Sequence, residues 1–191
     1  MQNISFAENA WKNSGLVYAY TRRFPQTPVF TQAADHVENR ADPDGPGGYE
    51  NISLLTERKY RAGTTVTAAL EFAGLGAPII MFSETMERDG EGDLRFDDYF
   101  EVVLYKNGLN VWRLEPKEGS VVWHKLVGVE FPVAENERHN LSVQINEKTL
   151  VIDADGHRIT LWSEELPEEF HVGIDACEGI NRFYNLTIAE Q

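Results

Sequence analysis

Short runs of alternating apolar and polar residues dominate the chain from Leu16 onward and favour β-strands over helices. Gly, Pro, Asn and Asp separate these runs and indicate turns between them. We expect strands at Leu16–Tyr20, Val29–Thr31, Ile52–Leu55, Thr64–Phe72, Pro78–Phe82, Asp98–Lys106, Leu109–Leu114, Ser120–Leu126, Asn140–Asn146, Thr149–Asp153, Arg158–Trp162, Glu169–Asp175 and Asn181–Ile188. Helical turns are expected only within Ser5–Asn13 and Ser163–Glu169. This pattern predicts an all-β fold, an antiparallel sandwich or a barrel.

Two segments lack strand character and are expected to be surface loops beside the strands. Asp42–Tyr49 is rich in Gly and Pro, and Glu84–Phe96 is rich in Gly, Asp and Glu. Loops of this kind often lie next to a functional site, because a rigid scaffold holds them in place.

The strongest local signal is Asn107-Gly108, which stands between two apolar runs. It predicts a two-residue type I′ turn, because both residues accept a positive φ. The strands would then pair Lys106 with Leu109, Tyr105 with Asn110, Leu104 with Val111, Val103 with Trp112, Val102 with Arg113 and Glu101 with Leu114.

This register sorts the side chains of the hairpin into two faces. A core face would carry Phe100, Val102, Leu104, Leu109 and Val111. The other face would carry Tyr99, Glu101, Val103, Tyr105, Asn110, Trp112 and Leu114. Aromatic rings beside a carboxylate and an amide are what a sugar site needs, because a pyranose has an apolar C–H face and a rim of hydroxyls. The same face could instead be covered by another segment, or could contact a protein partner.

The next strand, Ser120–Leu126, should lie beside Trp112, since the intervening loop is short. Its register decides whether Trp123 or His124 joins the mixed face. Trp123 would add a second stacking platform, and His124 would add a titratable group near Glu101. The sequence leaves both alternatives open.

Composition and charge narrow the function. The chain has 191 residues, of which 42% are hydrophobic, and this predicts one domain spanning 1–191 with a continuous core. The formal charge of −14 disfavours nucleic acids and anionic membrane surfaces as partners. No signal peptide and no membrane-spanning apolar run are evident, which predicts a cytoplasmic protein, or a secreted one if this is a mature or excised domain.

Metal and thiol chemistry have little support in the sequence. Cys177 stands alone and is expected to be a small buried apolar residue. The five histidines show no metal-ligand spacing, so we expect no metal ligands and no cofactor. Asp153-x-Asp155-Gly156 resembles part of a calcium loop, but Asp-Gly between two strands is more simply a hairpin turn.

Three runs resemble the central and closing strands of concanavalin A-like lectins and glucanases: DDYFEVVLYKNGLNVWRL (97–114), RHNLSVQINEKTLVIDADG (138–156) and EFHVGIDACEGINRFYNLTI (169–188). More narrowly, they are similar to small sandwich proteins found in bacterial polysaccharide-degradation clusters. The resemblance implies a two-sheet antiparallel jelly roll and an oligo- or polysaccharide ligand on the concave sheet or at the loop rim. Relatives of this kind often hold a structural calcium near the chain ends.

The chain departs from the retaining glucanases of this fold, which carry Glu-x-Asp-x-x-Glu on one strand. That motif is missing, since Glu91-Gly-Asp93 is followed by Phe96 where the second glutamate should be. A hydrolase would need another carboxylate pair such as Glu101 with Glu84. A lyase would need a base such as His124, Tyr99 or Tyr105, with a cation from Arg22 or Arg23, because Arg113 is expected on the other face.

Three functional hypotheses follow from these residues. The first is a non-catalytic glycan binder in which Tyr99, Tyr105 and Trp112 stack on sugars while Glu101 and Asn110 hydrogen-bond to them. The second is a small carbohydrate-active enzyme in which Glu101 works with His124 or Glu84. The third is a structural or interaction subunit, in its main form a homodimer joined through sheet edges or the aromatic face.

Overall fold

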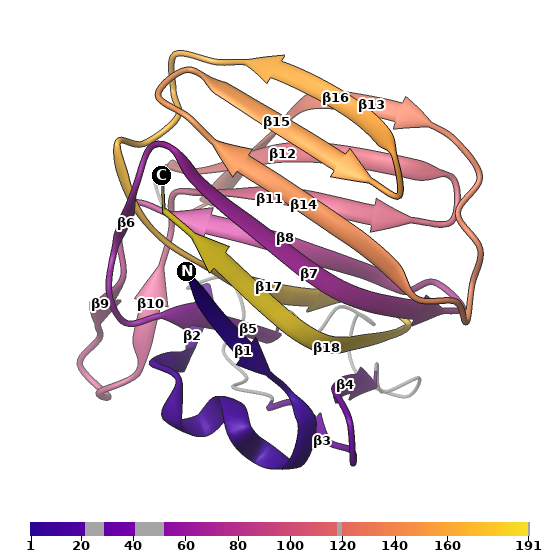
Figure 1. The fold of residues 1–191 in the computed structure, drawn as a ribbon. Helices are drawn as coiled ribbons and strands as arrows, with labels where there is room; N and C mark the ends of the chain where they lie inside the picture. Colours follow the sequence, from indigo (N-terminus) through magenta and orange to yellow (C-terminus); the bar gives the residue numbers. More distant parts are fainter. Residues whose placement is uncertain (22–28, 41–51, 118–119, 191) are drawn as a thin grey trace.

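The computed structural model describes residues 1–21, 29–40, 52–117 and 120–190, and in them two β-sheets pack face to face (Figure 1). The sheets have eight and ten strands. One short 3₁₀ segment, η1 (Ala7–Asn13), lies at one end of the sandwich. Of the pairings, β10 with β2 is parallel and the others are antiparallel. The expected two-sheet antiparallel sandwich is therefore confirmed.

The first sheet has the spatial order β16 (His157–Trp162), β15 (Thr149–Ala154), β14 (His139–Ile145), β7 (Thr64–Ala73), β18 (Ile180–Ala189), β4 (Val37–Arg40) and β3 (Thr31–Gln32), and β1 (Gln2–Ser5) also pairs with β18. The second sheet has the order β13 (Ser120–Glu130), β12 (Gly108–Lys117), β11 (Tyr99–Tyr105), β8 (Ala77–Ser83), β17 (Glu169–Cys177), β5 (Ile52–Thr56), β2 (Leu16–Thr21), β10 (Leu94–Phe96) and β9 (Glu87–Arg88), and β6 (Tyr60–Arg61) also pairs with β17.

The main core lies between the two sheets and follows the alternation of the sequence. On β7 the buried residues are Thr64, Val66, Ala68, Leu70 and Phe72, while their neighbours are half-buried. The expected core face of the hairpin is confirmed, because Phe100, Val102, Leu104, Leu109 and Val111 all belong to this core. Side chains of a strand point alternately to the two sides of a sheet, so every second residue is buried.

Several elements differ from the expectations. Short strands β1, β4, β6, β9 and β10 were not predicted, because two to four residues are too few to show a period. Two of them, β9 and β10, lie inside the expected loop Glu84–Phe96. Ser163–Glu169 forms a turn and not a helix. The expected loop Asp42–Tyr49 lies outside the described residues.

The β11–β12 hairpin is shifted by two residues from the expected register. Tyr105 pairs with Gly108 and Glu101 pairs with Trp112, so Lys106 and Asn107 form the turn. Gly108 has a φ of 138°, and a Cβ there would lie 2.0 Å from the carbonyl oxygen of Val129. The glycine is therefore needed for the close approach of β13 and not for a type I′ turn. A shift of two residues leaves every side chain on its expected face.

The same contact predicts the effect of a single methyl group. We expect Gly108→Ala to lower the free energy of unfolding by about 2–3 kcal/mol, because the new Cβ strains the backbone and pushes β13 away. Urea unfolding would measure the loss. Gly156→Ala is the matched control, because Gly156 also has a positive φ but no atom lies within 4 Å of its Cβ position. Equal losses in the two variants would contradict the steric argument.

Gly156 belongs to a hairpin turn that the sequence predicted. Ala154 pairs with His157, and the two turn residues Asp155 and Gly156 have φ angles of 50° and 90°. This confirms that Asp-Gly forms a tight turn between strands at this place.

The second sheet curls strongly, so that its outer side, away from the core, is concave. Strand β10 lies beyond β2 in the sheet, yet the Phe96 ring lies 4.9 Å from the ring of Tyr99 on β11. The two ends of the concavity meet in a second apolar cluster, the outer cluster, which consists of Ala19, Leu55, Ile79, Met81, Phe96, Tyr99 and Leu114. This cluster fills part of the concave outer face.

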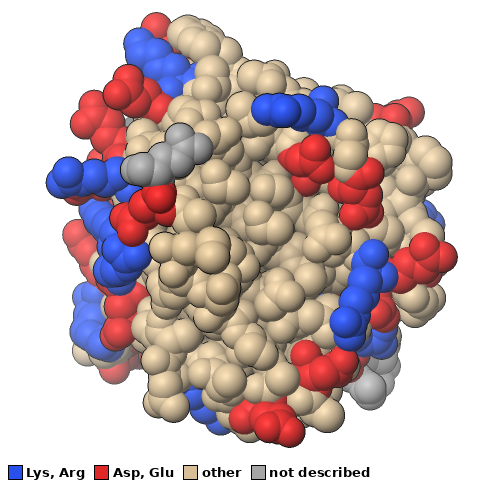
Figure 2. Space-filling view, viewed as in Figure 1, with Lys and Arg blue, Asp and Glu red and all other residues tan. Residues whose placement is uncertain are grey.

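The outer side of the first sheet has a different character. Figure 2 shows that its Lys, Arg, Asp and Glu side chains gather at the margins and leave the centre largely uncharged. Small polar residues such as Thr67 and Ser142 occupy this centre and hydrogen-bond to each other. In the described chain, no helix has the length and apolar character that crossing a membrane requires.

Candidate functional site

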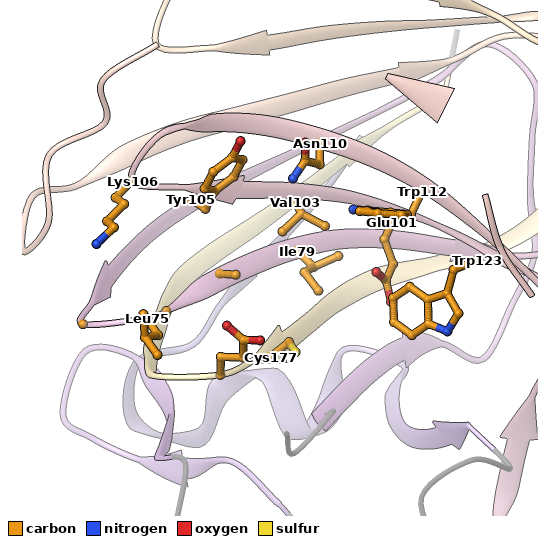
Figure 3. A pocket seen from close by; sticks show the side chains of 14 residues that line it. Leu75, Ile79, Glu101, Val103, Tyr105, Lys106, Asn110, Trp112, Trp123 and Cys177 are labelled. Carbon is orange, nitrogen blue, oxygen red and sulfur yellow. The ribbon is translucent and has the colours of Figure 1, made fainter. Parts of the chain in front are cut away.

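A pocket of about 310 Å³ lies in the part of the concave outer face that the outer cluster leaves open (Figure 3). Five strands of the second sheet and three turns contribute to it. Its lining comprises Gly74, Leu75, Gly76, Ala77, Ile79, Glu101, Val103, Tyr105, Lys106, Asn110, Trp112, Trp123, Cys177 and Glu178. We call this hollow the outer-face pocket. Its volume is within the usual range for small-molecule sites, near the lower end.

The structure brings together four of the five expected ligand-binding residues. Glu101, Tyr105, Asn110 and Trp112 all line the outer-face pocket, on the two neighbouring strands β11 and β12. Glu101 lies directly opposite Trp112 in the ladder. The mixed face of the hairpin is thus open at this end of the sheet.

Tyr99 differs from the expectation, because the outer cluster covers it. Its side chain is 2% exposed, and the Phe96 ring packs against it edge to face. A sugar cannot reach this ring, so we remove Tyr99 from the candidate binding residues. The expected covered face and the expected open face are both present, in different parts of the same sheet.

The β13 register decides between Trp123 and His124. Trp123 pairs with Leu114 and lines the outer-face pocket, whereas His124 pairs with Arg113 on the opposite side of the sheet. His124 lies 3.4 Å from the carboxylate of Glu115. The site therefore gains the second indole and not the imidazole.

The two indoles form an aromatic corner with a lysine above it. The rings of Trp112 and Trp123 are 6.0 Å apart and nearly perpendicular, with an interplanar angle of 80°. Lys125 comes two residues after Trp123 and pairs with Trp112 in the ladder, next to a bulge at Leu126. Its Nζ atom lies 5.5 Å from the centre of the Trp112 ring. Trp123 is 41% exposed and so presents a ring face to solvent.

Polar atoms of two kinds lie among these rings. Glu101 is 4% exposed and points away from its strand into the hollow, on the side of Trp112 and Trp123 (Figure 3). The side-chain oxygen of Asn110 is buried and accepts no hydrogen bond from the described residues. An acceptor in this state gains free energy when a ligand hydroxyl donates to it.

The turns that complete the outer-face pocket were not expected from the sequence. Gly76 and Gly179 let the β7–β8 and β17–β18 turns pack together, because a Cβ on Gly179 would lie 2.1 Å from the Gly76 nitrogen. The glycines in these two turns were the available signal in the sequence. The sequence around each turn does not show, however, that the two turns pack against each other. Cys177, expected to be buried, is half-buried at this wall.

The expected catalytic pairs do not assemble in the described residues. Glu84 is exposed beyond the end of β8 and does not line the outer-face pocket, and His124 lies on the other side of β13. Arg113 lies on the core side as expected and forms ion pairs with Asp98 and Glu165. Arg22 and Arg23 lie outside the described residues. Neither of the two proposed catalytic partners, Glu84 and His124, therefore lines the pocket with Glu101.

A buried acid, Asp175, lies near the outer-face pocket on β17. It is opposite Ile79 in the ladder and two residues from Cys177, and it is fully buried. Burial raises its pKa to about 7, although hydrogen bonds from the Ser53 hydroxyl, at 2.6 Å, and from a backbone amide oppose the shift. Asp175 does not line the pocket, so we assign it no contact with a ligand.

Metal ligands do not cluster in the described part of the chain. No group of three or more His, Cys, Asp and Glu side chains is arranged to hold an ion there.

Comparison with known proteins bears on the fold. No protein-family model and no curated protein matches the chain. Among solved structures, β-agarase A from Zobellia galactanivorans has a TM-score of 0.70 at 10% identity, covering 99% of this chain and 90% of that one. A Bacillus subtilis protein of unknown function with a galectin-like fold has a TM-score of 0.69 at 8% identity, covering 100% and 95%.

A carbohydrate-binding module, CBM66 from Bacillus subtilis, has a TM-score of 0.62 at 13% identity, covering 84% of this chain and 91% of that one. Identities this low show a shared fold and nothing finer. The concanavalin A-like jelly roll that the sequence resembles is the fold of this chain.

Proposed function

We propose that this concanavalin A-like jelly roll binds a neutral carbohydrate in the outer-face pocket. The observation that carries the proposal is the convergence of Trp112, Trp123 and Tyr105 with Glu101 and Asn110 in one hollow. Solved structures of the same fold include a carbohydrate-binding module and agarases, which supports a sugar as the ligand.

Each part of the outer-face pocket has a role in this proposal. The C–H face of a pyranose would lie against an indole, which removes apolar surface from water without leaving hydroxyls unpaired. Glu101 would accept hydrogen bonds from two neighbouring hydroxyls, as ionised carboxylates do. The side-chain amide of Asn110, which lines the pocket, would make a third hydrogen bond.

The charges around the outer-face pocket favour an uncharged ligand. Glu101, Glu178 and Lys106 line it, and the amine of Lys125 lies 5.5 Å from the centre of the Trp112 ring. These charges balance locally, whereas the whole chain carries −14. A sulfated or uronic acid chain would be repelled by the protein as a whole and would find no surplus of cations in the site.

Carboxylate spacing favours binding over hydrolysis. Besides Glu101, the described lining of the outer-face pocket has one carboxylate, Glu178. Glu101 and Gly173 both pair with Met81, so they lie in the same row across the sheet. Glu178 comes five residues after Gly173 in the chain. At about 3.4 Å per residue their Cα atoms are roughly 17 Å apart along the strand direction, so carboxyl groups roughly 5–10 Å apart, as in a glycosidase pair, would need both side chains to extend toward each other.

A titration of neutral oligosaccharides, followed by tryptophan fluorescence and calorimetry, tests the proposal. Agaro-, manno- and laminari-oligosaccharides form the panel, with sulfated carrageenan oligosaccharides as the charged comparison. We expect saturable binding of at least one neutral series and none of the sulfated one. Cleaved product in the mixture would replace binding by hydrolysis, and silence across the panel would leave the aromatic corner as a protein contact.

The carboxylate of Glu101 predicts a measurable share of the affinity. Glu101→Gln keeps the shape and removes the charge, so hydrogen bonds to sugar hydroxyls weaken from charge-assisted to neutral strength. We expect Kd to rise about tenfold, or about 1.4 kcal/mol. Glu147→Gln is the control, because Glu147 is exposed in the β14–β15 turn, beside Thr64 at the start of β7, whereas the end of β7 leads to the pocket. An unchanged Kd in Glu101→Gln would remove Glu101 from the binding site.

A further inference from the structure

We infer that the outer-face pocket is a groove open at both ends, in which an internal stretch of a linear neutral glycan lies parallel to β11 and β12. This inference rests on the proposed function and deepens it. It follows from the positions of the two openings, from the residues that border the pocket on its sides, and from the order of its rings and polar groups.

The two openings lie at opposite ends of the pocket. Leu75 is 68% exposed and Lys106 is exposed at the end formed by the turns, next to the row of Tyr105. Trp123 is 41% exposed at the other end, in the row of Tyr99. Tyr99 comes six residues before Tyr105 on β11, which is roughly 20 Å along the strand. Figure 3 shows Leu75 and Lys106 at one end of the lining and Trp123 at the other.

The side of the pocket toward β17 and β5 offers no accessible surface. Asp175 is fully buried, and Ser53, whose hydroxyl donates to it, is 1% exposed. These two residues continue the row of Ile79, which lines the pocket. A sugar chain in the pocket therefore cannot continue across the sheet in this direction.

A lysine borders the pocket on the opposite side, along the edge strand β13. The Nζ atom of Lys125 lies 5.5 Å from the centre of the Trp112 ring. A Cβ added to Gly128 would lie 2.7 Å from Lys125 Cε and 2.9 Å from the side-chain oxygen of Asn110. The lysine side chain thus extends along β13 from the row of Trp112 toward the row of Asn110, in the space that Gly128 leaves free. A glycan bordered on both sides in this way has its axis parallel to the strands.

The order of side chains along the pocket suits an internal unit. Glu101 and Asn110, the hydrogen-bonding groups of the proposed site, lie in its two middle rows. Tyr105 lies in the row on one side of them and Trp123 in the row on the other. A sugar whose hydroxyls bond to Glu101 and Asn110 would therefore have further rings of the same chain on both sides of it, one toward Tyr105 and one toward Trp123.

Blocked chain ends give the first test. The six-ring agaro-, manno- or laminari-oligosaccharide that binds is reduced at one end with borohydride and carries a bulky ether at the other, and calorimetry compares it with the parent chain on the intact protein. We expect Kd values within about twofold of each other, since neither end contacts the protein. Loss of binding on blocking would overturn the inference and leave the proposed function intact. No binding by any unmodified series would overturn both.

Removal of the ring at one opening gives the second test. Trp123→Ala should raise Kd about tenfold for a four-ring chain, which reaches Trp123 from the middle of the pocket. For a two-ring chain, held in the rows of Glu101 and Asn110, the rise should be less than about twofold. His124→Ala is the matched control and should leave both Kd values unchanged, because His124 is the next residue on β13 but points to the other side of the sheet. Equal effects of Trp123→Ala on the two chain lengths would indicate a compact site and overturn the inference.

Discussion

Trp112→Ala should abolish glycan binding while the protein remains folded. Trp112 lines the outer-face pocket, is half-buried, and packs against the outer cluster and the Trp123 ring. We expect the loss of this stacking indole to weaken binding by about 2 kcal/mol or more. This corresponds to an increase in Kd of about thirtyfold or more. Calorimetry with the best ligand of the neutral panel would measure it.

Two further variants separate binding from folding in this experiment. Trp162→Ala is the matched control, because Trp162 is 60% exposed on the outer side of the first sheet, away from the pocket. It should leave Kd unchanged. Trp112→Phe keeps an aromatic face and should recover part of the affinity. A large fall in the melting temperature of Trp112→Ala with unchanged affinity would identify Trp112 as a core residue.

Asp175→Asn should make the stability of the protein less dependent on pH. In the unfolded chain the carboxyl pKa is near its usual value of 3.8, and in the folded protein burial raises the pKa to about 7. Below about pH 4 both states are protonated. Between pH 4 and pH 7 the unfolded state loses this proton first, so the free energy of unfolding falls by up to about 1.4 kcal/mol per pH unit.

The stability associated with the protonated Asp175 is therefore fully present below pH 4 and is lost as the pH rises to about 7. The total is on the order of 4 kcal/mol, and asparagine, which does not titrate, avoids this loss. Urea unfolding at several pH values between 4 and 8.5 would measure the difference between Asp175→Asn and the parent. That difference should grow with pH and become constant above about 7. Glu137→Gln, on the exposed surface, should track the parent throughout.

A difference between Asp175→Asn and the parent that is the same at every pH would contradict this account. It would mean that Asp175 keeps an ordinary pKa in the folded protein. The hydrogen bonds from the Ser53 hydroxyl and a backbone amide would then stabilise the ionised carboxylate as much as burial destabilises it.

The sequence predicted the faces of the β11–β12 hairpin better than its turn. The register was wrong by two residues, because Gly108 is required by its contact with Val129 on β13, a contact that Asn107-Gly108 does not reveal. Glu101, Tyr105, Asn110 and Trp112 still came together, since an even shift preserves the side to which each residue points.

What could not be predicted depends on contacts between distant segments. Tyr99 has the same local pattern as Tyr105, but Tyr99 is buried in the outer cluster with Ala19 and Leu55, from strands distant in the sequence, whereas Tyr105 lines the open pocket. The wall at Cys177 and Glu178 likewise depends on two turns packing together through Gly76 and Gly179. Alternation along one strand contains no information about such long-range contacts.

The pairing of the first strand with the last has a consequence for how the chain folds. Gln2 on β1 faces Ile188 on β18, and Ile4 and Phe6 are buried in the core (Figure 1). This part of the core cannot close until β18 has been synthesised, and the loop that the pairing closes contains nearly all the other strands of both sheets. Such long-range pairing slows folding to milliseconds or seconds, so we expect the nascent N-terminal segment to wait unpaired on the ribosome.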